Sequence, residues 1–377
     1  MGRAIVLATP VFFLLIGLEY LVGRLRGVKI YRLNDTLNSL SLGVMSQISG
    51  LFLRLLGIGI YAAVYSVAAL QELPAEAWWV WVLAVVVYDL CYYWYHRFSH
   101  TCSLLWAAHV VHHQSQEYNL STALRQTSSG ALLGWVFYLP MALAGFPPEV
   151  FAVAALIDLL YQYWIHTEQV GKLGWFDRIF ASPSNHRVHH AINDRYLDHN
   201  YGGIFVIWDR LFGTFVDEDE PCQYGTRSPL RSWDPVRANL QVYLDLWQKS
   251  RRARSLREAF AYWFKPPGWQ PVGADGQAWT QPSLDAACLE RFNPALAPGS
   301  APLALGGFVL ALAGSALLLW NAALLPTPWL AGGALTLILS LWGTGAVLQS
   351  RLTPGAAAGL QLVCLGAAAV LFVSLPR

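Results

Sequence analysis

The chain has 377 residues, of which 55% are hydrophobic and only 13% are charged, and its formal net charge is +2. An average soluble domain carries about 25% charged residues, so this composition excludes an ordinary soluble protein. The near-neutral charge and the absence of a basic tail give no indication of nucleic acid as a partner.

Apolar segments recur along the chain at about the 20 residues that a bilayer-spanning helix requires. The first, 4–22, is followed by no signal-peptide cleavage pattern, so we expect a retained anchor. Residues 37–70 form a longer stretch containing Arg54, which could be tilted, kinked or partly re-entrant. A third predicted span, 77–95, is rich in Trp and Tyr and runs directly into His96.

Two shorter apolar stretches, 131–145 and 150–165, flank a Phe-Pro-Pro-Glu sequence. They predict a helical hairpin that returns to its starting side. Three further apolar spans, near 302–322, 329–348 and 354–375, contain almost no charge and no histidine. We expect these spans to be structural or oligomerising, because functional membrane sites need polar residues.

The intervening segment, 217–300, is polar and contains clusters of Pro and Gly. Asp234 followed by Pro235 predicts a helix start, since this pair supplies an N-cap and a favoured first helical residue. The apolar residues of this helix suit either packing against the rest of the protein or lying on the membrane surface, and we favour packing. They are Val236, Leu240, Tyr243, Leu244 and Trp247.

The positive-inside rule orients this arrangement. Four basic residues follow the first span and only Arg3 precedes it, which places the loop after that span in the cytoplasm. If 37–70 crosses the membrane once, every histidine also lies on the cytoplasmic side, whereas two crossings would invert the assignment. The four basic residues are Arg24, Arg26, Lys29 and Arg32.

All ten histidines fall between residues 96 and 199. They form one HxxxH group and two HxxHH groups, and positions i, i+3 and i+4 share a helix face, so their imidazoles can converge on a metal. Eight such ligands are too many for one ion, which indicates two. The groups are His96/His100, His109/His112/His113 and His186/His189/His190; His166 stands at the end of the hairpin, and His199 falls outside the groups.

Imidazole suits Zn, Cu, Fe and Ni, so the ligand type alone does not select the metal. A structural zinc site usually includes Cys, but the five cysteines (Cys91, Cys102, Cys222, Cys288 and Cys364) form no CxxC pair, and we expect reduced thiols. Redox iron fits better if the task is to activate O₂ against a C–H bond, and a site at the membrane face would let a lipid chain reach the metals.

Together these features predict an all-α integral membrane protein in which a transmembrane helix bundle carries a cytoplasmic helical cap with a histidine-rich dimetal site. We divide it into a membrane-embedded core at 1–216, a cytoplasmic helical and loop segment at 217–300, and a C-terminal three-span bundle at 301–377.

The three histidine boxes, in this order between membrane spans, resemble the fatty acid hydroxylase superfamily, which includes sterol desaturases and lipid hydroxylases. The resemblance covers about residues 10–270. Segments 31–36, 118–126, 196–203 and 208–215 look like the alkylglycerol monooxygenase branch and its bacterial relatives. We therefore expect a multi-pass protein of a bacterial inner membrane.

The resemblance implies that two iron ions and O₂ hydroxylate or desaturate a fatty-acyl, alkylglycerol or sterol-like lipid. It also implies the eight box histidines as ligands, with His166 as a ninth. In the alkylglycerol monooxygenase branch an acidic residue directly follows the first box, whereas Thr101 does here. This difference weakens an ether-lipid activity and its dependence on tetrahydrobiopterin.

Metal-bound histidines usually donate their second N–H to a carboxylate or carbonyl. The candidate acids are Asp89, Asp158, Glu168, Asp194 and Asp198. Asp89 stands out because an acid within an apolar span is costly without a partner. Asn119, Arg125 and Gln126 follow the second box and are candidates to line the access path.

Electrons must come from outside, because the chain has no haem, flavin or Fe–S motif. We expect a separate electron-donor protein or tetrahydrobiopterin. The basic residues Arg251, Arg252, Arg254 and Arg257 could dock an acidic donor or face anionic lipid headgroups.

Two other classes compete with the oxygenase. A membrane transporter of zinc or iron would place its ligands near mid-membrane on broken helices, whereas these histidines lie at span ends and in loops. A zinc-dependent membrane hydrolase would usually show a carboxylate ligand or base.

Overall fold

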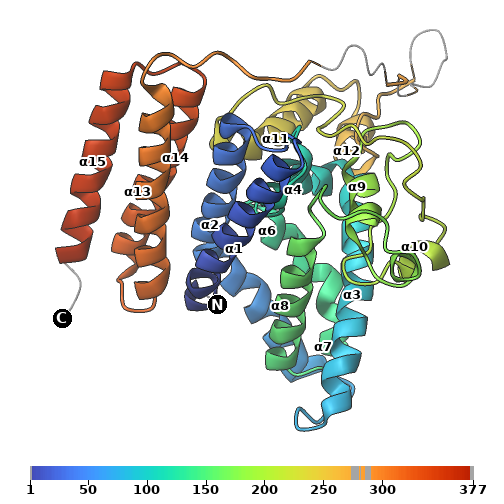
Figure 1. The fold of residues 1–377 in the computed structure, drawn as a ribbon. Helices are drawn as coiled ribbons and strands as arrows, with labels where there is room; N and C mark the ends of the chain where they lie inside the picture. Colours follow the sequence, from blue (N-terminus) through green and yellow to red (C-terminus); the bar gives the residue numbers. More distant parts are fainter. Residues whose placement is uncertain (1, 273–279, 281, 285–289, 374–377) are drawn as a thin grey trace.

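The structure is a computed structural model, and it describes residues 2–272, 280, 282–284 and 290–373, without the side chains of 54, 55 and 367–373. Within these ranges the chain forms only helices, turns and two isolated β-bridges, which confirms the all-α prediction (Figure 1). Cys91, Cys102, Cys222 and Cys364 are free thiols, and Cys288 lies outside the described residues.

The longer helices are α1 (Gly2–Leu25), α2 (Leu33–Ala68), α3 (Trp78–Thr101), α8 (Pro148–Trp164), α11 (Pro235–Arg251), α13 (Ser300–Asn321), α14 (Thr327–Leu348) and α15 (Pro354–Val373). The shorter ones are α4 (Ser103–His113), α5 (Leu120–Ala123), α6 (Gly130–Gly134), α7 (Leu139–Leu143), α9 (Pro183–His190), α10 (Ile207–Leu211) and α12 (Leu256–Phe264), with 3₁₀ helices η1 (Trp135–Tyr138) and η2 (Phe176–Arg178).

Several helices have the length and apolarity of membrane spans. Among the described residues α1, α13 and α14 meet both requirements, and α2, which bends by 42°, is a fourth if its two halves form one span. The predicted span 77–95 lies in α3, which is long enough, but Trp, Tyr and Asp residues lower its hydropathy. The chain is therefore a multi-pass membrane protein.

The predicted helical hairpin is present. Its first arm is broken into α6, η1 and α7, and α8 forms the second (Figure 1). The tip meets the end of α2, since the Leu70 amide donates to the Leu143 carbonyl at 2.9 Å. Gly145 at this tip has φ +92°, and a Cβ there would lie 2.0 Å from the Gln71 carbonyl oxygen, so this contact requires glycine.

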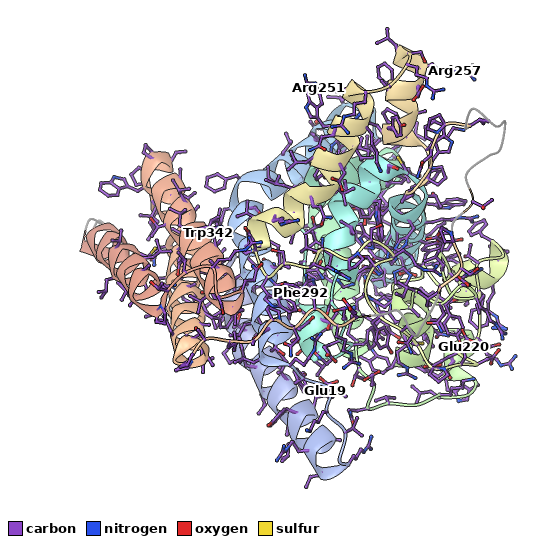
Figure 2. All side chains as sticks on the ribbon, turned by 90° about the horizontal axis from the view of Figure 1, so that it is seen from above. Glu19, Glu220, Arg251, Arg257, Phe292 and Trp342 are labelled. Atoms are coloured by element: carbon purple, nitrogen blue, oxygen red, sulfur yellow. The ribbon has the colours of Figure 1, made fainter. Side chains whose placement is uncertain are left out.

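The three C-terminal helices lie side by side at one flank of the molecule, as both overall views show (Figures 1 and 2). They pack along α2, where Leu37, Val44 and Ile48 share one apolar core with Phe308 and Leu341. The flank with the histidines is built from α3, α4, α8 and α9.

Asp234 caps α11 as predicted, and its carboxylate accepts the Val236 and Arg237 amides at 2.9 and 3.0 Å. The packing face differs from the prediction. α11 buries Ala238 and Leu246, whereas the expected core residues Leu240, Leu244 and Trp247 are exposed.

Candidate metal centre

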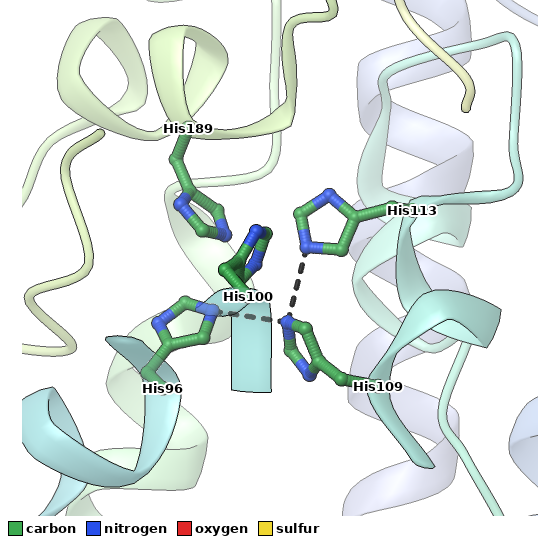
Figure 3. A group of neighbouring side chains, drawn as sticks. All are labelled: His96, His100, His109, His113 and His189. Atoms are coloured by element: carbon green, nitrogen blue, oxygen red, sulfur yellow. Dashed lines mark hydrogen bonds between the residues drawn. The ribbon is translucent and has the colours of Figure 1, made fainter. Parts of the chain in front are cut away.

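Five histidines from three helices form a first group (Figure 3). One potential ligand atom from each ring lies within 4.8 Å of all the others. The group comprises His96 and His100 from α3, His109 and His113 from α4, and His189 from α9.

Four histidines form a second group under the same criterion: His112 from α4, His166 two residues after the end of α8, and His186 and His190 from α9. Each HxxHH box is thus divided between the groups, with the i and i+4 residues in one and the i+3 residue in the other. The structure brings together all nine histidines expected as ligands, and His199 belongs to neither group.

The local sequence explains how α9 is held. The Ser182 hydroxyl accepts the Asn185 amide and the Asn185 side chain accepts the Ser182 amide, which forms a capping box directly before the third histidine box. Arg187, in the middle of that box, donates two hydrogen bonds of 2.7 Å to Glu218 and one of 2.9 Å to the Thr167 carbonyl beside His166.

Backbone carbonyls orient four of the rings. The Nδ1 atoms of these rings lie 2.7–3.0 Å from carbonyl oxygens. A carbonyl only accepts, so each Nδ1 carries the hydrogen and each Nε2 of the neutral ring keeps a lone pair. The ring and carbonyl pairs are His96 with Tyr201, His112 with Arg125, His166 with Gln162, and His189 with His199.

These tautomers bring lone pairs face to face. The Nε2 atoms of His112 and His166 are 3.1 Å apart, and neither can donate to the other. Two nitrogens bound at right angles to one metal at about 2.1 Å would be about 3.0 Å apart. The buried Nε2 atoms of His100, His189 and His190 have no hydrogen-bond partner among the described residues. A cation between the rings would accept both the facing lone pairs and the unpartnered Nε2 atoms. The donor set therefore fits a metal.

Burial favours the neutral form of several of the rings. It is the largest cause that lowers the pKa of His112 to about 4, and it holds the pKa values of His109, His166 and His186 well below their ordinary value. Neutral imidazole is the form that binds metal, so both groups are ready to bind at neutral pH.

The predicted acids have different partners from those expected, with one exception. Asp198 lies 3.4 Å from Nδ1 of His100, as expected for an acid that orients a ligand. Asp89 instead accepts the Ile204 and Phe205 amides at 2.6 and 3.0 Å and the Trp208 indole N–H at 2.8 Å. It therefore holds the loop that carries the Tyr201 carbonyl, and through that carbonyl it affects His96 only indirectly.

The described contacts of the other three acids are with residues other than the histidines. Asp158 accepts the Gln162 side-chain amide at 2.7 Å and lies beside Asp89. Asp194 is exposed and pairs with Arg227. Glu168 is exposed and lines a polar pocket with Tyr224.

The residues expected on the access path are structural. Asn119 caps α5 and donates to the Ile30 carbonyl at 2.6 Å. Arg125 is 1% exposed and donates to the Val111 carbonyl at 2.7 Å, while its own carbonyl holds His112. Gln126 is half-buried and donates to the Ala123 carbonyl at 3.0 Å. These contacts give the three residues a role in local structure, most directly Arg125, which positions His112.

A polar pocket of about 170 Å³ adjoins the second group. Its wall includes Tyr118, whose ring packs against His166 and His190 at centroid distances of 5.6 and 5.2 Å. Lys29 and Arg291 also line it. The sequence did not point to this pocket, because its lining comes from five separate segments of the chain.

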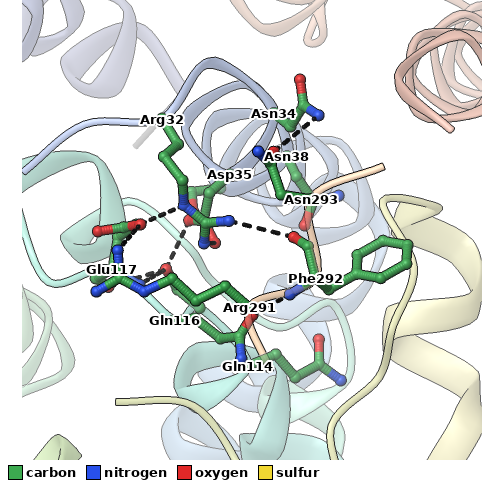
Figure 4. A network of polar contacts seen from close by, with 12 residues as sticks. Arg32, Asn34, Asp35, Asn38, Gln114, Gln116, Glu117, Arg291, Phe292 and Asn293 are labelled. Carbon is green, nitrogen blue, oxygen red and sulfur yellow. Dashed lines mark hydrogen bonds and ion pairs between the residues drawn. The ribbon is translucent and has the colours of Figure 1, made fainter. Parts of the chain in front are cut away.

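A network of polar contacts closes one side of the pocket (Figure 4). Arg32 pairs with Glu117 and donates to the Phe292 carbonyl at 3.2 Å. The Phe292 amide donates to Gln116 at 2.8 Å, and Arg291 lies 3.5 Å from Glu117. The segment that leads into α13 is therefore attached to the loop after α4.

Fold and site define a helical membrane protein with two adjoining all-histidine groups, each suited to a metal ion. The family model described as fatty acid hydroxylase matches residues 81–214, which include every histidine of both groups. The part of the chain that holds the histidines is thus similar to the fatty acid hydroxylase family.

Three curated relatives illustrate the similarity. The alkylglycerol monooxygenases of Danio rerio and Homo sapiens are 43% and 40% identical, over 70% of this chain and 59% of their own length. The ornithine lipid hydroxylase of Rhizobium tropici is 34% identical over 37% of this chain and 43% of its own length. The match thus spans about three fifths of the monooxygenases. No solved structure matches the chain.

Proposed function

We propose that this protein is an O₂-dependent di-iron oxidoreductase that hydroxylates, or desaturates, a C–H bond of a membrane lipid. The observation that carries the proposal is the pair of histidine groups, in each of which one ring nitrogen per histidine lies within 4.8 Å of all the others. Its relatives are named as monooxygenases and hydroxylases of lipids. None of these relatives is named as a transporter.

Bound iron would supply the reduction of O₂ and the oxidation of the C–H bond. The five histidines of the first group would hold one ion and the four of the second group the other. The carbonyls of Tyr201, Arg125, Gln162 and His199 keep the lone pairs aimed, and Asp198 orients His100. Burial of the rings excludes bulk water from the reacting centre.

The polar pocket supports a lipid that has a polar end. Tyr118, which lines the pocket, also packs against the rings of His166 and His190. A headgroup held there by Lys29, Glu168 and Arg291 would bring carbons near the headgroup close to the second metal. Alkylglycerols are the first substrates to test, because the alkylglycerol monooxygenases align with 70% of this chain, although Thr101 departs from that branch.

The remaining parts complete the proposal. Residues 1–216 carry the reaction, 217–300 form a cytoplasmic segment, and 301–377 support the core. The basic residues that follow α1 support a cytoplasmic position of the histidines in a bacterial inner membrane. A separate protein or tetrahydrobiopterin would supply the electrons.

The test is lipid mass spectrometry of the purified, iron-loaded protein in lipid nanodiscs under ¹⁸O₂ with a chemical reductant. We expect one lipid class to gain an ¹⁸O atom, or to lose two hydrogens, and about two irons per chain. Oxygen gained only from H₂¹⁸O, with zinc bound and activity kept under anaerobic conditions, would establish a hydrolase. Metal uptake by vesicles without a lipid product would establish a transporter.

A further inference from the structure

Two consecutive helices outside the metal centre expose large apolar side chains. On α11, Leu240, Leu244 and Trp247 are 47%, 53% and 56% exposed. On α12, Leu256, Phe260 and Phe264 are 81%, 62% and 60% exposed. Spacings of three and four residues place each set on one helix face, so each helix carries an exposed apolar stripe.

Basic residues border both stripes. Five of them lie between residues 249 and 257, an interval that contains no acid. Arg237 and Arg251 lie on the stripe side of α11 near its two ends, and Lys265 follows Phe264. Figure 2 shows Arg251 and Arg257 at the outer end of the two helices. The five residues are Lys249, Arg251, Arg252, Arg254 and Arg257.

The position of α11 matches that of a membrane surface. It lies near the upper ends of α2, α13 and α14 in Figure 1 and runs across the view in Figure 2, which looks down on that end. The first turn of α11 is fixed against a span, because Gly345 of α14 approaches Trp233 so closely that a Cβ would lie 2.2 Å from its carbonyl oxygen.

We infer that α11 and α12 form an interfacial hairpin that lies on a bilayer containing anionic lipids. The apolar stripes enter the boundary of the acyl chains, and the basic residues contact lipid phosphates. A helix with an apolar face, a basic border and too many charges to cross the bilayer is typical of this location. Lys and Arg side chains beside the stripe reach the headgroups while their methylene stems stay among apolar atoms.

The hairpin also holds the second histidine box. At one end of α4, the Ser103 amide and hydroxyl donate to the Lys265 carbonyl at 3.0 and 2.8 Å. At the other end, the Gln114 side chain donates to the Ala238 carbonyl at 3.1 Å. Because α4 carries His109, His112 and His113, anchoring the hairpin fixes the height of this box at the membrane surface.

The experiment uses the full chain in nanodiscs with an environment-sensitive fluorophore on Leu244→Cys or Phe260→Cys, and wild-type protein as the blank for native cysteines. Asp245→Cys, exposed on α11 but off the stripe, is the matched control. We expect acyl-brominated lipids to quench the two stripe positions about threefold more than the control, and aqueous iodide to show the reverse order.

Changing the lipid composition distinguishes contact with anionic lipid from contact with a protein partner. We expect stripe quenching to be stronger with phosphatidylglycerol than with phosphatidylcholine alone, and Arg251→Gln/Arg252→Gln/Arg254→Gln/Arg257→Gln to remove this difference. Stripe labels that stay open to iodide in both bilayers would overturn the inference. Labels protected in native membranes but open in pure lipid would overturn it in favour of a protein partner. Neither readout depends on the proposed activity.

Discussion

At the scale of single residues, the ring atoms that face the metal groups are buried lone pairs held by hydrogen bonds on the opposite side of each ring. Replacing one ring should therefore remove a ligand without disturbing its neighbours. For His112→Ala we expect loss of at least half of the bound metal and of activity, with membrane insertion intact, measured as metal per purified chain.

His199 provides the matched control for His112. Its ring Nδ1 lies 2.8 Å from the Leu197 carbonyl, and only its backbone carbonyl holds His189. His199→Ala should keep the metal content of the wild type. Equal metal content in both variants would contradict the assignment of His112 as a ligand.

The Glu218 carboxylate gives the third box a dependence on pH. Burial alone would raise its pKa, but the hydrogen bonds and charge of Arg187 outweigh burial and hold the pKa of Glu218 below its ordinary value. As pH falls through about 4.5, the unfolded chain gains a proton before the folded chain does, so folding stability decreases. Above that range the contribution is fully present.

Glu218→Gln should therefore lower stability by about 1–3 kcal/mol at pH 7 and by less at pH 4, because it removes one partner of a mostly buried ion pair. The apparent Tm in detergent at the two pH values measures this. Asp219→Asn is the control, since Asp219 makes only exposed ion pairs with Lys172 and Arg195. The same loss at both pH values in Glu218→Gln would contradict the role of ionisation.

The sequence predicted the nine converging histidines because residue type and spacing mark them. It could not predict most of their supporting contacts, since the atoms that hold His96, His112, His166 and His189 are backbone carbonyls. Every residue has a carbonyl, so no side chain signals this role. The position of Asp89 within an apolar span predicted that it has a partner. That partner is a distant loop, which donates three hydrogen bonds to its carboxylate.

At the scale of elements, the loop after α9 depends on a close approach at Gly203. A Cβ there would lie 2.7 Å from Oδ1 of Asp158 and 2.8 Å from Oδ1 of Asp89, and both side chains are buried. Gly203→Ala should displace the loop, move the Tyr201 carbonyl away from His96 and reduce stability by about 1–3 kcal/mol.

Gly171→Ala is the matched control, because a Cβ at Gly171 meets nothing within 4 Å and its φ is not positive. Thermal unfolding and metal content measure both variants. Wild-type values for Gly203→Ala would show that the loop does not orient the first group.

The helix α11 shows where sequence reasoning succeeded and where it failed within one element. The Asp234-Pro235 start was correct, because capping depends on neighbouring residues. The packing face was wrong, because α11 buries small and polar positions: Ala238, whose carbonyl accepts from Gln114 after α4, and Asn239, which accepts the Ser128 amide. Hydropathy favours burying Leu240, Leu244 and Trp247 but does not distinguish a protein interior from a lipid surface.

At the scale of the whole molecule, hydropathy predicted the helices and the hairpin, but it carried no information about the docking of α13–α15 along α2. It also left open whether 37–70 forms one span or two. The structure shows one bent helix with its far end at the hairpin tip. The two flanks of the molecule therefore differ. One consists of apolar helices packed along α2, and the other holds the histidine groups.

Metal removal should therefore affect the two flanks differently. Without a cation, the Nε2 lone pairs of His112 in α4 and His166 after α8, which are 3.1 Å apart, repel each other. A metal that binds only the folded state at about 100 times its Kd contributes about 2.7 kcal/mol per site. Chelation should lower the apparent Tm and increase hydrogen exchange in α4 and α9, while α13 and α14 keep their protection. Adding back Fe²⁺ without oxygen should restore both values. Unchanged exchange in α4 and α9 after complete metal loss would show that the histidines are held by packing alone.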